Sequence, residues 1–188
     1  MYLLKNQSMR NKIIIFDDLY EHIELIKGEI FREFHSLIES NELLIYPNDI
    51  NEFDDLICHL ELLFCDDTDK IETALTYFTD QFNADNLVFI IDYEFNNRDN
   101  FDGIRIFENI NTKFSYAIAI FFTAKGANEI NKMRIKVNTL EGKIPIVKKP
   151  FFRGINGKLD INLKVLKEEN IIDMLRENIA YANKHKRL

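Results

Sequence analysis

The chain has 188 residues, the size of one domain, and its 46% hydrophobic and 29% charged residues exclude a disordered protein. Its longest wholly apolar runs are about half a dozen residues, against the roughly 20 that cross a bilayer, and its N-terminus lacks a signal-peptide core, so we expect a cytoplasmic protein. Two cysteines, Cys58 and Cys65, exclude a disulfide framework and a zinc knuckle.

Charge is distributed unevenly along the chain. Residues 48–100 carry 14 acidic and 2 basic side chains, whereas residues 101–188 carry 17 basic and 9 acidic ones. The acidic block argues against nucleic acid as a partner of the middle of the chain. The basic last third, with Lys132, Arg134 and Lys136, is where we would look for a partner protein or a homodimer contact; neither nucleic acid nor a membrane is expected as a partner.

Five short apolar runs predict buried strands. They lack the polar alternation of a half-exposed strand, as strands of a parallel sheet covered on both faces do. In chain order they are Lys12–Phe16, Leu43–Tyr46 (the weakest), Leu87–Ile91, Ala117–Phe122 and Ile144–Val147.

Between the apolar runs, hydrophobic residues recur at helical spacing. The predicted helices are Leu19–Ile38, Asn51–Phe64, Thr68–Phe82, Asp102–Ile110, Ala127–Val137 and Glu168–Asn183. This alternation predicts an α/β protein with a parallel sheet and right-handed crossovers, and with two helices between the second and third strands. Leu159–Val165 fits either a strand or a helix.

Polar residues follow the apolar runs at the points where strands should end. Asp17 and Asp18 follow the first run, Asp92 the third, Thr123 the fourth and Lys149 the fifth. Ligands of open parallel sheets bind at the carboxyl ends of the strands, so we expect these side chains to meet at one edge.

Three clustered carboxylates repel one another unless a cation lies among them. Hard oxygen ligands favour Mg²⁺, and the four histidines, His22 among them, show no ligand spacing and are interpreted as ordinary. A neighbouring ammonium indicates that an anion also arrives, and phosphate is the natural candidate. The residues therefore predict a phosphoryl transfer to an aspartate, assisted by Mg²⁺, with a lysine and a threonine holding the arriving oxygens.

This ordered set of residues resembles the receiver domains of two-component response regulators. The matching stretches are KIIIFDD (12–18), LVFIID (87–92), Asp102-Gly103-Ile104, FFTAKG (121–126) and KKPF (148–151). The resemblance covers roughly residues 11–152, and the last helix completes it.

The resemblance implies a flavodoxin-like, doubly wound fold. Its five-stranded parallel sheet would have the order 2-1-3-4-5, with an extra helix between strands 2 and 3. We expect residues 1–10 to be an N-terminal tail and residues 11–188 a single receiver-like domain. That domain would contain an inserted segment at about 48–85 and an extended C-terminal helix.

The resemblance also assigns roles at the predicted metal site. Asp92 matches the phosphoacceptor, and Asp18 and Asp92 match the direct Mg²⁺ ligands. Asp17 matches the second acidic position, which holds metal-bound water or orients its neighbour. The third protein ligand would be the backbone carbonyl of Glu94.

Further roles concern the phosphoryl group. Thr123 matches the hydroxyl that hydrogen-bonds it, and Lys149 the lysine that pairs with it. Glu94 and Lys125, two residues beyond Asp92 and Thr123, carry opposite charges. They could bridge over the pocket and hinder the attacking water, which predicts slow self-dephosphorylation and faster decay in Lys125→Ala.

The chain departs from the family at two places that bear on output. The acceptor loop, DYEFNNRDNFDG, is longer than usual, and Ile146 stands where the family has an aromatic switch residue. Rotation of an aromatic ring coupled to Thr123 therefore cannot be the output signal.

We expect a stand-alone receiver that is not an enzyme beyond slow self-dephosphorylation. It would accept a phosphoryl group from a histidine kinase or a phosphotransfer protein, and act through a downstream protein or store phosphate. The alternative is a receiver-like binding module that signals without phosphate. A haloacid-dehalogenase-type phosphatase is a weaker candidate, because it needs a second Asp two residues after the first, where this chain has Glu94 or Tyr20.

Overall fold

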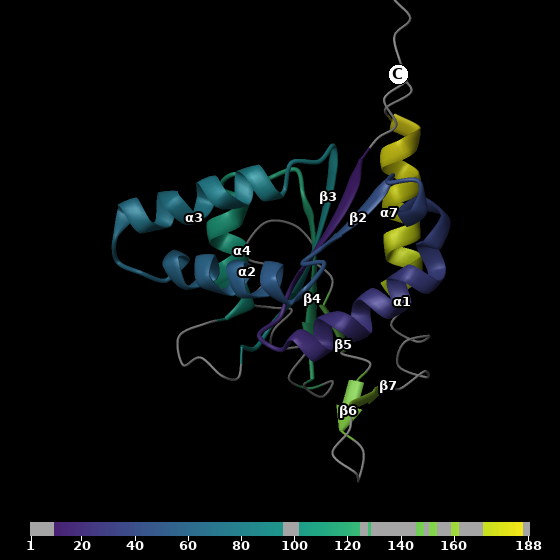
Figure 1. Ribbon diagram of the computed structural model, residues 1–188, viewed down its shortest axis with the longest axis horizontal. Coiled ribbons are helices and arrows are strands. Elements are labelled where there is room, and N and C mark those ends of the chain that lie inside the picture. The colour runs from purple at the N-terminus through teal and green to yellow at the C-terminus, as the bar shows by residue number, and fades with distance from the viewer. Residues whose placement is uncertain are drawn as a thin grey trace, which may run out of the picture.

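The computed structural model describes residues 10–95, 102–124, 128, 146–148, 151–153, 159–161 and 171–185. Strands and helices alternate along the chain, as Figure 1 shows. In order they are β1 (Asn11–Phe16), α1 (Tyr20–Glu39), β2 (Leu43–Tyr46), α2 (Ile50–Leu63), α3 (Thr68–Gln81), β3 (Asn86–Asp92), α4 (Gly103–Asn111), β4 (Ile118–Thr123), β5 (Ile146–Lys148), β6 (Phe151–Arg153), β7 (Leu159–Ile161) and α7 (Ile171–His185).

The main sheet is parallel, with β2, β1, β3 and β4 side by side in that order, which is a flavodoxin-like arrangement and confirms the α/β class. The backbone of β5 pairs with β4, also in parallel, with Thr123 opposite Lys148. Both α2 and α3 lie between β2 and β3 in the chain. The sheet thus has its first strand near the centre, and crossovers run outward from it on both sides.

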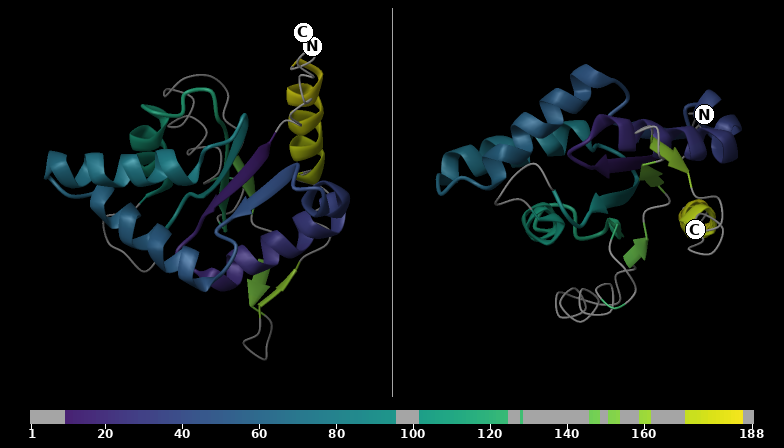
Figure 2. Two further views of the ribbon diagram at one scale, coloured as in Figure 1. Left: turned by 45° about the horizontal axis from the view of Figure 1, so that its top comes forward. Right: turned by 90° about the horizontal axis from the view of Figure 1, so that it is seen from below.

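Helices cover both faces of the sheet (Figure 2). Each face has its own hydrophobic cluster. Alternate residues of β1 point to opposite faces, because the side-chain period of a strand is two. Ile13 and Ile15 join the cluster under α1 and α7, whereas Ile14 and Phe16 join the one under α2, α3 and α4. All four are fully buried, which explains why the strand reads as a continuous apolar run.

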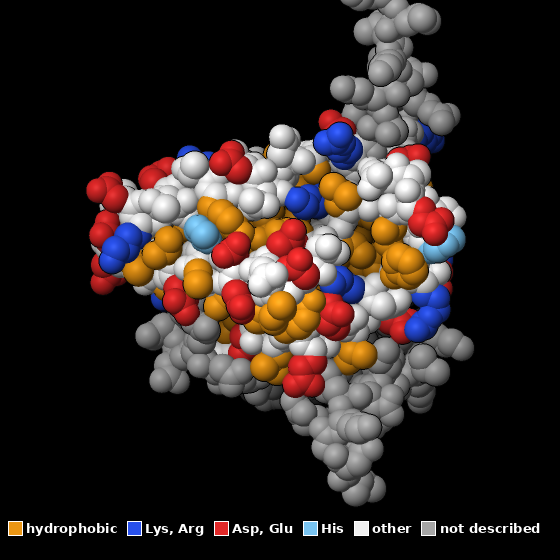
Figure 3. All heavy atoms as spheres, in the orientation of Figure 1, with side chains coloured by type: hydrophobic (Ala, Val, Ile, Leu, Met, Phe, Trp, Pro, Cys, Tyr) orange, Lys and Arg blue, Asp and Glu red, His pale blue; other side chains and the backbone are white. Residues whose placement is uncertain are grey.

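The acidic middle of the sequence forms the exposed faces of α2 and α3. Figure 3 shows acidic side chains gathered over these two helices. The exposed acidic residues described in this segment are Asp49, Asp54, Asp55, Glu61, Asp66, Asp67, Asp69, Glu72, Asp80 and Asp85. In the described part of the chain, no helix combines the length and the apolar character that crossing a membrane requires.

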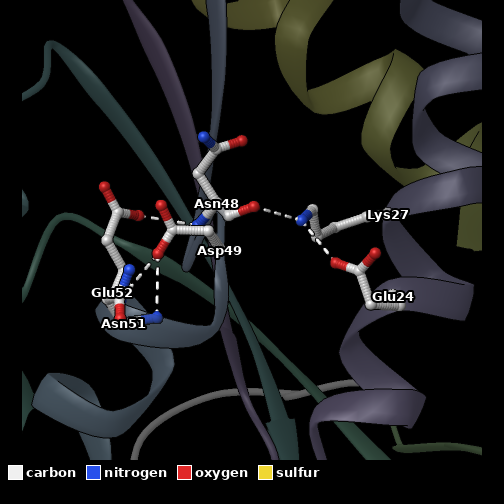
Figure 4. Close-up of polar contacts among 6 residues, drawn as sticks. All are labelled: Glu24, Lys27, Asn48, Asp49, Asn51 and Glu52. Atoms are coloured by element: carbon white, nitrogen blue, oxygen red, sulfur yellow. Dashed lines mark hydrogen bonds and ion pairs between the residues drawn. The ribbon is translucent and has the colours of Figure 1, made fainter.

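Polar contacts hold the loop between β2 and α2 against α1 (Figure 4). The Asp49 carboxylate caps α2 by accepting from the backbone N–H of Asn51 at 2.9 Å and of Glu52 at 3.0 Å. The Lys27 ammonium of α1 donates to the Asn48 carbonyl and to Glu24, each at 2.6 Å. The bond from Lys27 to Asn48 thus joins α1 to the loop that leads into α2, and these two helices lie on opposite faces of the sheet.

The segment after β5 contains an element that the sequence did not predict. β6 pairs antiparallel with β7, with Phe152 opposite Asp160. Leu159–Ile161 is therefore a strand. The sequence pattern of Leu159–Val165 had fitted either a strand or a helix, and the structure decides for a strand in its first three residues. The helix expected at Ala127–Val137 lies outside the described residues, apart from Asn128.

Candidate phosphoacceptor and metal site

Strand register brings the predicted site residues to one edge of the sheet. Phe16, the last residue of β1, is opposite Ile91 of β3, so Asp17 comes next to the end of β3, where Asp92 stands. Asp92 is in turn opposite Phe122, the residue before Thr123. The sequence predicted that Asp92 and Thr123 follow their strands. In the structure each is the final residue of its strand, β3 and β4.

The three aspartates form a compact group of carboxylates. Asp17, Asp18 and Asp92 each offer an oxygen, and these atoms lie within 4.8 Å of one another. Asp17 and Asp92 are buried, with 2% and 3% exposure, and Asp18 is half-buried. Carboxylates at this separation repel one another, and a cation among them would relieve that repulsion. An all-oxygen donor set of this kind fits Mg²⁺, for which Asp18 and Asp92 would be the direct ligands.

The Asp17 carboxylate accepts hydrogen bonds from its own loop and from α1. The backbone N–H of Leu19 donates to Asp17 Oδ1 at 3.0 Å. His22 Nδ1 lies 3.0 Å from Oδ1 and 3.1 Å from Oδ2. The sequence interpretation of His22 as an ordinary residue did not foresee this contact with the cluster. A histidine in the first turn of the helix that follows an Asp-Asp pair was the available signal.

Backbone hydrogen bonds attach the start of the loop after Asp92 to β4 and to the first residue of α4. The N–H of Tyr93 donates to the Phe122 carbonyl at 2.7 Å, and the N–H of Gly103 donates to the Tyr93 carbonyl at 3.2 Å. The N–H of Glu94 donates to Asp92 Oδ1 at 3.1 Å, and Glu94 also forms an antiparallel bridge with Asp102. The first three residues of the acceptor loop are thus fixed, although residues 96–101 lie outside the described part.

The surroundings of Tyr93 disfavour ionisation of its hydroxyl. Burial, followed by the negative charges of Asp102 and Glu94, raises the pKa of Tyr93 above its usual value. The tyrosine ring packs edge-on against Phe121 with 6.1 Å between ring centroids. Tyr93 therefore packs against the hydrophobic cluster beside β3 and β4.

The remaining predicted residues divide into two groups. Thr123 is fully buried at the end of β4, which places this residue at the same edge of the sheet as the aspartates. Lys149 and Lys125 lie outside the described residues, and Ile146 is described only as a backbone position of β5. The structure therefore brings together the acidic part of the predicted site and its threonine.

Comparisons with known proteins give likeness to solved structures alone. No family model matches the chain, and no curated protein matches it. A solved structure described as a response regulator receiver domain protein from Clostridium thermocellum is similar, with 17% sequence identity and a TM-score of 0.45. The superposition covers 94% of this chain and 97% of that one.

Proposed function

We propose that this chain is a receiver that accepts a phosphoryl group on Asp92 in a Mg²⁺-dependent reaction. The single observation that supports it most is the group of three carboxylate oxygens within 4.8 Å, two of them on buried residues, at the carboxyl edge of a parallel sheet. The order of the residues along the chain, from Asp17 to Lys149, adds to this support.

In the proposed reaction, an Asp92 carboxylate oxygen attacks the phosphorus of a phosphohistidine. The new P–O bond forms as the P–N bond breaks, and the electron pair goes to the imidazole nitrogen, which takes up a proton. The N–H of Glu94 holds the Asp92 carboxylate in place, and Thr123 donates its hydroxyl to an arriving phosphoryl oxygen. Bound Mg²⁺ would supply positive charge against the phosphoryl oxygens.

The proposal includes the complete five-stranded order 2-1-3-4-5 with its inserted helix. Support comes from β5, whose backbone pairs with β4 and which ends at Lys148, one residue before Lys149. A lysine that follows the neighbouring strand would reach the edge where Thr123 stands. There it would pair with the phosphoryl group, as the resemblance implies.

The proposed partners are a histidine kinase or phosphotransfer protein as donor and a downstream protein as reader, in the cytoplasm. Phosphorylation adds a charge of about −2 at the edge of the sheet, and Thr123 and Lys149 would move toward it. With Ile146 in place of an aromatic switch, this movement would change the surface by backbone displacement and not by ring rotation.

Mass spectrometry of the intact protein tests the proposal. The protein is incubated with Mg²⁺ and a small acyl phosphate, with Asp92→Asn as the matched variant. One added phosphoryl group that Asp92→Asn lacks supports the receiver. No adduct on the wild type would overturn it in favour of the binding module, and continuous release of inorganic phosphate would favour the phosphatase.

A further inference from the structure

His22 makes a two-point contact with the metal site without belonging to it. Its Nδ1 lies within hydrogen-bond distance of both Asp17 oxygens, at 3.0 and 3.1 Å. The side chain of His22 is only 14% exposed and that of Asp17 only 2%. Because carboxylate oxygens accept, Nδ1 carries the proton and donates it to Asp17.

The geometry separates a ligand from a supporting residue. The mutually close oxygens belong to Asp17, Asp18 and Asp92, and neither ring nitrogen of His22 joins that group. The imidazole therefore contacts one member of the cluster from outside it. Residues placed in this way orient the acidic groups around a metal ion and are not bound to the ion themselves.

Asp17 needs such support because its surroundings push its carboxylate away. Three negative groups within 4.8 Å repel one another, and a side chain with free rotation would turn from the other two. Two donors oppose this rotation, the Leu19 N–H from the loop and His22 from α1. The Leu19 bond is local to the loop, whereas the His22 bond ties Asp17 to a helix buried against the sheet.

We infer that His22 is a positioning residue, which holds the Asp17 carboxylate in the orientation that a bound Mg²⁺ requires. Since the metal site is part of the proposed function, this role rests on it. The role is distinct from simple core packing, because it depends on one donor atom and not on the volume of the ring.

Two substitutions of His22 distinguish the effect of its Nδ1–H donor from the effect of its side-chain volume. His22→Leu keeps an apolar side chain and removes the donor. His22→Asn restores an N–H donor on the atom attached to Cγ, close to where Nδ1 stands. His35→Leu is the matched control, because His35 lies on the same helix and pairs with a carboxylate, Glu39, at 3.1 Å on an exposed surface.

Isothermal titration of the full chain with Mg²⁺ gives the readout, with circular dichroism to verify that each variant is folded. We expect His22→Leu to weaken Mg²⁺ binding about 10–100-fold, His22→Asn to recover most of the loss, and His35→Leu to bind as the wild type does. Wild-type affinity in His22→Leu, or no recovery in His22→Asn, would overturn the role. If His22→Leu does not fold, His22→Asn is compared with the wild type instead. A folded His22→Asn that binds Mg²⁺ about 10–100-fold more weakly than the wild type would then overturn the role.

The same titration distinguishes this role from the proposed function. Tight Mg²⁺ binding by a wild type that takes no phosphoryl group would reject the receiver and leave the role of His22 intact. A wild type that accepts the phosphoryl group while His22→Leu binds Mg²⁺ normally would reject only the role of His22. A wild type that binds no Mg²⁺ would reject both.

Discussion

The backbone carbonyl of Asp92 lies directly against Gly103, so that a Cβ on residue 103 would be 2.2 Å from that oxygen and 3.0 Å from Cγ2 of Ile91. Gly103 is the first residue of α4, and Asp102 caps this helix through the Arg105 N–H at 2.7 Å. The end of β3 and the start of α4 therefore touch at a point where no side chain fits.

Gly103→Ala should destabilise the protein and displace Asp92. The backbone carbonyl cannot move aside as a flexible side chain would, so we expect a loss of about 1–3 kcal/mol in the free energy of unfolding, as in other overpacked sites. Urea denaturation monitored by circular dichroism measures this loss.

Gly28→Ala is the matched control for Gly103→Ala. Gly28 lies inside α1, and a Cβ on residue 28 would meet no atom within 4 Å, so alanine there should stabilise the helix by about 0.5–1 kcal/mol. The two substitutions thus have opposite expected signs. Equal effects of both would show that contact with Asp92 does not require glycine at residue 103.

Mg²⁺ should stabilise the folded protein through the aspartate cluster. At 100 times its Kd, an ion that binds only the folded state raises the free energy of unfolding by about 2.7 kcal/mol. Asp18→Asn, at the most accessible of the three positions, should lose most of this gain. Thermal denaturation in Mg²⁺ and in a chelator gives the difference.

An exposed acidic residue provides the control for the Mg²⁺ experiment. Asp66→Asn removes the same charge from the turn between α2 and α3, and we expect it to respond to Mg²⁺ as the wild type does. If Asp66→Asn and Asp18→Asn lost the same amount, the ion would act by general screening of the acidic surface and not at the cluster.

Thr123 should contribute through its hydroxyl and not through its shape. Thr123→Val keeps the branched side chain in a fully buried position, and Thr123→Ser keeps the hydroxyl. Since a hydrogen bond to a charged group contributes about 1.5–3 kcal/mol, we expect Thr123→Val to slow phosphorylation of Asp92 roughly tenfold or more. Thr123→Ser should stay near the wild-type rate. Initial rates of phosphate incorporation measure both, and a slow Thr123→Ser with a fast Thr123→Val would contradict this role.

The sequence predicted the elements whose signal is local. Ile13–Phe16 is apolar at each position because both faces of β1 are covered. Such a continuous apolar run can be recognised in the sequence without knowledge of the fold. Asp92 and Thr123 could be placed at one edge because parallel strands end there together. His22 could not be placed in this way, because its contact with Asp17 depends on the direction in which α1 leaves the sheet. The pairing of β6 with β7 was missed because three-residue strands carry almost no periodicity.

A second polar contact, which does not involve the acidic cluster, ties the edge strand β2 to the inserted helices. The hydroxyls of Tyr46 on β2 and Tyr77 on α3 are 2.5 Å apart, and the Tyr46 hydroxyl also lies 3.2 Å from the Glu52 carbonyl. Burial, and then the hydrogen bond with Tyr77, raise the pKa of Tyr46 above its usual 10.0, and burial likewise raises the pKa of Tyr77. The folded protein therefore holds these phenol protons more tightly than the unfolded chain does.

Stability should fall as the pH rises above about 10, because the unfolded chain then releases the Tyr46 proton while the folded protein keeps it. Each proton held only by the folded state contributes a slope of about 1.4 kcal/mol per pH unit. Tyr46→Phe should cost about 1 kcal/mol near neutral pH, for the lost hydrogen bond, and should have a shallower alkaline loss. Urea denaturation across the alkaline range measures both, with Tyr181→Phe on the exposed face of α7 as control. If the free energy of unfolding fell equally steeply with pH in Tyr46→Phe and in the wild type, the Tyr46 proton would not be the source of the alkaline loss.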